Sequence, residues 1–104
     1  MAEARSNLLD QDQALDAAAR ILKGDPYGNT RAEIANGIKL QMLIVKGADP
    51  CKKEPLQTPI WVFSVKAIDK HTLDEKGQPQ KIDGLLTLDA SSGKLSCATL
   101  PFLD

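Results

Sequence analysis

The sequence predicts an α+β fold in which an N-terminal helix packs on a four-stranded antiparallel meander sheet. Three features lead to this prediction: a helical pattern near the start, an apolar β run at 58–68, and a hairpin signal near the end of the 104-residue chain. The predicted strands follow one another without a helical pattern between them, which favours antiparallel pairing of neighbours. The chain is long enough for one domain with one hydrophobic core.

The run at 58–68 predicts the central strand. It contains the single Trp, one of the two Phe and several β-branched residues, all of which fit a pleated surface. Alternation places Trp61, Phe63 and Val65 on one face and Ile60 and Val62 on the other. We therefore expect Trp61 in the core, with a second face that is partly buried.

The first helix is predicted from about position 10 to Lys23. Its small and apolar side chains recur at helical spacing, at Ala14, Leu15, Ala18, Ala19 and Leu22. Lys23 and Gly24 provide a basic last turn and a C-terminal glycine. The alanine-rich face predicts close approach to a sheet. We expect residues 1–9 to be disordered and residues 10–104 to form a single domain.

Two interpretations compete for the segment that follows the next turn. Thr30 and Glu33 have the spacing of a helix capping box. Against a helix, apolar residues further on alternate with period two, and the Asn-Gly pair at 36–37 would weaken a helix interior. We therefore predict a strand over 38–46, which could begin near Arg31 with a bulge or a tight turn at the Asn-Gly pair.

Two long polar connections and a closing hairpin complete the pattern. The connections are predicted at 47–57 and 69–81, and the last two strands at 82–89 and 94–100. Asp89 to Gly93 predicts a tight turn, because Asp accepts hydrogen bonds from nearby backbone N–H groups and Gly takes positive φ without strain. The apolar residues at the end of the chain are expected to fold back on the core.

The helix, the Trp61 strand and the final hairpin together resemble the PepSY domain. The hairpin runs from Gly84 to Leu95 and reads Gly-Leu-Leu-Thr-Leu-Asp-Ala-Ser-Ser-Gly-Lys-Leu, and the family's last hairpin commonly has the form strand, Asp-Ala-x-Thr-Gly, strand. The resemblance spans roughly residues 12–99. The chain departs from the family in its long connections and in Ser92, where the family often has Thr.

The resemblance implies an extracytoplasmic, non-catalytic module that binds or restrains another protein, in some relatives a peptidase. It is the only indication of a periplasmic or secreted location, since the start of this chain lacks the apolar run of a secretory signal. Two alternatives share the order of helix and meander: a cystatin-like cone that binds a small ligand, and the small bacterial immunity-type proteins.

Composition argues against several classes of partner. The net charge of −1 and the scattered basic residues provide no electrostatic surface for nucleic acid or anionic membranes. No apolar run approaches the roughly 20 residues of a membrane-spanning helix. We therefore expect no nucleic acid and no membrane insertion, and a protein partner or a homodimer instead.

Catalytic and metal-binding patterns are also missing from the sequence. Cys51, His71 and Cys97 lack the short spacing of a zinc pair, and the glycines match no phosphate-binding loop. We expect no enzyme activity, no metal and no cofactor. We also expect the two cysteines to be unpaired, because three strand spacings would place them about 14 Å apart unless the long connection at 47–57 folds over.

The candidate binding surface is predicted on the face of the central strand opposite Trp61. Ile60 and Val62 are expected there, joined by Leu43 and Val45 from the preceding strand. An apolar sheet face that nothing covers favours self-association or a partner. We therefore predict a homodimer or a complex that Val62→Lys disrupts. If the C-terminal residues cover this face, the site would move to the two long connections.

Overall fold

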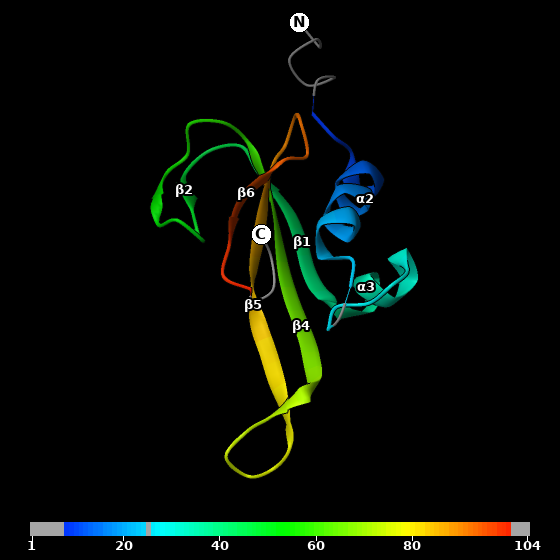
Figure 1. The fold of residues 1–104 in the computed structure, drawn as a ribbon. Helices are drawn as coiled ribbons and strands as arrows, with labels where there is room; N and C mark the ends of the chain where they lie inside the picture. Colours follow the sequence, from blue (N-terminus) through cyan, green and yellow to red (C-terminus); the bar gives the residue numbers. More distant parts are fainter. Residues whose placement is uncertain (1–7, 25, 101–104) are drawn as a thin grey trace, which may run out of the picture.

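In the computed structural model, residues 8–24 and 26–100 are described. The elements in chain order are α2 (Gln11–Leu22), α3 (Arg31–Gly37), β1 (Ile38–Ile44), β2 (Ala48–Asp49), β3 (Glu54–Pro55), β4 (Ile60–Leu73), β5 (Pro79–Asp89) and β6 (Leu95–Ala98). The main sheet has the order β1-β4-β5-β6, and each neighbouring pair is antiparallel (Figure 1). The predicted α+β fold, with an N-terminal helix on an antiparallel meander, is confirmed.

α2 begins at a complete capping box. Gln13 donates its backbone N–H to Asp10 Oδ1 over 2.8 Å, and the Asp10 backbone N–H donates to Gln13 Oε1 over 3.0 Å. The buried side of the helix consists mainly of alanines, as the sequence predicts. These small side chains let α2 lie close against the sheet, so larger side chains of the sheet fill the layer between them.

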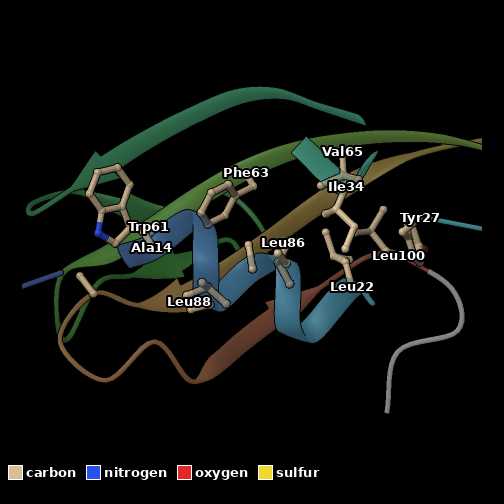
Figure 2. Close-up of a cluster of buried hydrophobic side chains, with 14 of the residues drawn as sticks. Ala14, Leu22, Tyr27, Ile34, Trp61, Phe63, Val65, Leu86, Leu88 and Leu100 are labelled. Carbon is tan, nitrogen blue, oxygen red and sulfur yellow. The ribbon is translucent and has the colours of Figure 1, made fainter. Parts of the chain in front are cut away.

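The core lies between α2 and one face of the main sheet, which we call the inner face (Figure 2). Trp61 and Phe63 from β4 point into it, opposite Leu88 and Leu86 from β5. Trp61 is buried and donates its indole N–H to the Leu9 carbonyl oxygen over 3.1 Å. A buried ring whose single donor is satisfied has a structural role, as predicted.

Both ends of the described chain join this core. Leu9 packs against it and donates its backbone N–H to the Ala90 carbonyl over 2.7 Å, so the ordered contacts begin before the predicted helix. Leu100 is buried in the same cluster, which confirms for this residue that the chain end folds back. The rest of the predicted frayed start, 1–7, and of the apolar tail, 101–104, lies outside the described residues.

The segment after Thr30 is a short helix, so the earlier strand start near Arg31 is wrong, whereas the strand predicted over 38–46 is present as β1. Thr30 Oγ1 accepts from the Glu33 N–H over 3.1 Å, and Glu33 Oε1 accepts from the Thr30 N–H, also over 3.1 Å. The capping box outweighs the poor helix propensity of the Asn-Gly pair because that pair lies in the last turn. Gly37 is also needed there, since a Cβ would lie 2.6 Å from the Lys66 carbonyl oxygen.

The predicted polar connection at 69–81 is also mostly strand. β4 continues to Leu73 and β5 begins at Pro79, and Asp74 closes the turn by accepting the Lys76 and Gln78 N–H groups. The two strands extend beyond the rest of the sheet as a ribbon (Figure 1), and the molecule measures 55 × 28 × 21 Å. A ribbon that is solvated on both faces needs no apolar alternation. Its polar sequence therefore resembles the sequence of a loop.

Cys51 and Cys97 form a disulfide, which contradicts the prediction that both are unpaired. Their Cα atoms lie 6.1 Å apart. The prediction counted strand spacings within the sheet, but Cys51 lies on the 47–57 connection, which leaves the sheet. This connection forms the small β2–β3 hairpin and folds back, so that Cys51 reaches β6.

Candidate functional site

The pairing register separates the four residues of the predicted binding surface. Directly opposed residues in an antiparallel pair share a face, and Leu43 lies opposite Trp61, whereas Met42 lies opposite Val62. Leu43 is therefore on the inner face with Trp61, and the prediction that it shares a patch with Val62 is wrong. An irregularity between Ile38 and Leu40 shifts the register of β1, and an alternation pattern alone does not reveal such a shift.

Ile60 and Val62 do lie on the predicted outer face, but they are only 3% and 1% exposed. Val62 lies opposite Thr87, and Thr87 lies opposite Cys97, so the disulfide anchors the 47–57 connection beside them. Ile60 also lines a pocket together with side chains of that connection. Among the described residues, the 47–57 connection covers this part of the outer face. Val62 is therefore unsuitable as a contact residue for a partner.

Four of the large exposed apolar side chains cluster on β1 and directly after it, whereas Ile68, Leu73 and Leu95 are exposed elsewhere. The four are Leu40, Met42, Leu43 and Val45, between 38% and 59% exposed, and we call them the β1 surface. β1 is an edge strand of the main sheet, so in the described residues it pairs only with β4. Leu40 and Met42 lie on the outer face, and Leu43 lies on the inner face. Both faces of this edge are therefore apolar and exposed.

A groove of about 240 Å³ follows the edge between β1 and the two helices. Gln11 and Leu15 of α2, Ala35 of α3, and the segment from Ile38 to Gln41 line it. Gln41 donates its side-chain amide to the Gln11 carbonyl oxygen over 2.9 Å, which fixes the start of α2 beside the strand. The edge is therefore held rigid from one side while its apolar side chains stay accessible.

A groove of about 400 Å³ lies between α2 and α3, and Arg20, Lys23 and Arg31 line it together with Asp16. Arg31 there pairs with Asp16 and, at 3.6 Å, with Asp12. These carboxylates neutralise the guanidinium group and connect the two helices. These ion pairs give Arg31 a structural role at the contact between α2 and α3.

Two titratable groups, Asp89 and Tyr27, have clearly shifted pKa values. A hydrogen bond from the Ser91 hydroxyl, with smaller backbone contributions, lowers the pKa of Asp89, which closes the last turn. Burial raises the pKa of the Tyr27 hydroxyl to about 12. Among the described residues, no three His, Cys, Asp or Glu side chains meet as a metal site would require. The structure does not describe the His71 side chain.

No family model, curated protein or solved structure matches this chain. The described part of the chain contains no helix that combines the length and the apolarity of a transmembrane span. The sequence signal for the exposed β1 edge is the uncharged run from Leu40 to Val45, between Lys39 and Lys46.

Proposed function

We propose that this chain is a non-catalytic protein-binding module that accepts an extended segment of a partner protein alongside β1. The observation that carries the proposal is the β1 surface: an edge strand with exposed apolar side chains on both faces. A solvated antiparallel edge normally has a polar outer side, and both faces become apolar where a further layer or strand covers them.

Within the described residues, the apolar part of β1 lacks the usual sequence protection of an exposed edge. Natural sheets protect such edges with central charges, prolines or bulges, whereas here Lys39 and Lys46 only flank the apolar run. The irregularity next to Lys39 precedes this run and leaves Leu40 to Ile44 in regular pairing with β4. Strand addition uses such an edge in two ways, since main-chain hydrogen bonds supply affinity and alternate side chains supply specificity.

Restraint of a peptidase is the form of protein binding that the resemblance to the PepSY domain implies. An extracytoplasmic location belongs to the same proposal. The Cys51–Cys97 disulfide supports it independently, because stable disulfides are characteristic of oxidising compartments. An intact mass that equals the fully reduced value, in protein prepared without reductant, would argue against this location.

The packing favours a protein partner over a small ligand in a cystatin-like cone. Such a cone needs a lined cavity between the helix and the sheet. In the described residues, Phe63, Leu86 and Leu22 are buried and fill this layer (Figure 2). Immunity-type binding of another protein would use the same β1 edge, so it differs from the preferred function in its partner and not in its site.

Affinity capture with three baits tests the proposal. The baits are the parent chain, the double variant Met42→Lys/Val45→Lys, and Leu73→Lys, whose side chain is also exposed but lies at the end of β4. We expect the parent and Leu73→Lys to retain a protein that the double variant loses. A protein held equally by all three baits, or no retained protein, would contradict binding at β1.

A further inference from the structure

β4 has a second stretch of open edge, because β1 begins part of the way along it. The first residue pair between the two strands is Ile38 with Val65, and Gly37 then lies against the Lys66 carbonyl oxygen. From Lys66 onward, the described residues provide no strand on this side of β4, although β4 continues to Leu73. The main-chain groups that face this side are therefore not used by the sheet.

A groove of about 380 Å³ lies on this open stretch and combines an apolar floor with cations. Ala67, Ile68 and Ile82 contribute the apolar part, and Ile68 is exposed. Three lysines surround it, at Lys39, Lys66 and Lys81. One carboxylate also lines the groove, Asp83, which lies 3.9 Å from the Lys66 ammonium group with both side chains more than half exposed. Cations therefore outnumber anions in this groove.

The other side of the same stretch has a different chemistry. A groove of about 260 Å³ lies there between the 26–29 turn and β4, and Ile68 lines this groove as well. Tyr27 and Asp69 are buried along it, and Glu33 and one cation, Lys70, also contribute to the lining. The carboxylates make this side unfavourable for a negative charge. An extended chain beside β4 would therefore meet cations on one face and a mixed, acid-bearing surface on the other.

We propose that this β4 edge is a binding site for an acidic extended peptide segment of a partner protein, added as a strand beside Lys66–Lys70. Because side chains of a strand alternate between faces, carboxylates at every second position would all face the lysine groove. The intervening apolar side chains would face the 26–29 turn. Charge complementarity selects the partner, and the main-chain groups on this side of β4 define its orientation.

The test uses a synthetic heptapeptide in which valine and glutamate alternate, with the full chain. We expect saturable binding, with NMR shifts at 66–70. Reversal of two groove charges in Lys66→Glu/Lys81→Glu should weaken binding by about tenfold or more. The matched variant Lys76→Glu/Lys94→Glu changes the net charge equally outside the groove and should bind as the parent does.

Three further peptides separate strand addition from simple charge attraction. One has lysine in place of glutamate and should not bind. The other two have N-methyl groups on alternate residues in opposite registers, so each lacks the donors of one edge, and one of the two should lose binding. Equal binding of both N-methylated registers, shifts confined to 40–45, equal effects of the two double variants, or no binding of the acidic peptide would each overturn the proposal.

Discussion

Gly93 and Gly77 adopt nearly the same backbone conformation in different surroundings. Their φ angles are +76° and +77°, in the left-handed region. A Cβ at Gly77 would meet open space, whereas one at Gly93 would lie 3.1 Å from Ala17 Cβ and 3.2 Å from Leu9 Cδ1. The positive φ confirms the predicted turn after Asp89. The close contact with α2 is a tertiary feature that the turn sequence does not contain.

This pair of glycines allows backbone strain and packing to be measured separately. An L-residue in this region costs about 1–2 kcal/mol, so both Gly77→Ala and Gly93→Ala should destabilise the fold by that amount. Gly93→Ala should cost more, because its Cβ crowds Ala17 and Leu9. Chemical denaturation of both variants measures the difference. Equal losses of unfolding free energy in the two variants would show that the last turn does not pack tightly against α2.

Asp89 makes the same turn sensitive to acid. Its carboxylate accepts from the Ser91 hydroxyl over 2.7 Å and from the Ser91 and Ser92 N–H groups, and the pKa of Asp89 is below its ordinary value of 3.8. A lowered folded-state pKa stabilises the fold above the ordinary pKa, and this contribution disappears as the pH falls through the folded-state value. The turn should therefore weaken below about pH 4.

NMR titration of the Asp89 carboxyl group tests this explanation. We expect Ser91→Ala to raise the pKa of Asp89 towards its ordinary value, because the Ser91 hydroxyl contributes most to the shift. Ser92→Ala is the matched control, since the Ser92 side chain contributes least. A larger change of the Asp89 pKa in the Ser92 variant than in the Ser91 variant would disprove the main role of the hydrogen bond from the Ser91 hydroxyl.

At the scale of elements, the sequence predicts the helix and the alternation of β4 because both follow from local periodicity. It mispredicts α3, because the capping box and the period-two pattern compete over the same few residues. The β4–β5 ribbon is also missed, since a strand that is solvated on both faces has no apolar alternation. The path of the 47–57 connection could not be predicted either, because only its disulfide to Cys97 shows where it returns.

The disulfide should make the 47–57 connection contribute to the stability of the fold. It closes a sequence separation of 46 residues, for which the chain-entropy model gives about 4 kcal/mol. We expect Cys51→Ser/Cys97→Ser to lose up to that amount in chemical denaturation. The variant should also bind a hydrophobic dye more strongly, because Ile60 and Val62 lose their cover. The parent with a thiol reductant should behave like the variant, and an unchanged midpoint in both would contradict the covering role.

At the scale of the molecule, the sequence predicts the antiparallel order of the sheet and its inner face, but not the functional surface. Identifying that surface requires the register of β1 against β4, which the irregularity beside Lys39 shifts. It also requires knowing that the connection, anchored at Cys97, covers Ile60 and Val62. Once the register of β1 and the cover over Ile60 and Val62 are known, the exposed apolar side chains of the β1 surface are seen to lie on an open edge strand. This edge is the basis of the proposed function.

Amide hydrogen exchange of β1 in the complex tests this central claim most directly. The account predicts that a partner captured by the parent chain slows exchange at alternate amides between Leu40 and Val45, since a strand added beside β1 would accept the hydrogen bonds of the amides that face away from β4. Exchange within α2 should stay unchanged. Unchanged exchange across β1 in a saturated complex, with new protection elsewhere, would contradict the account.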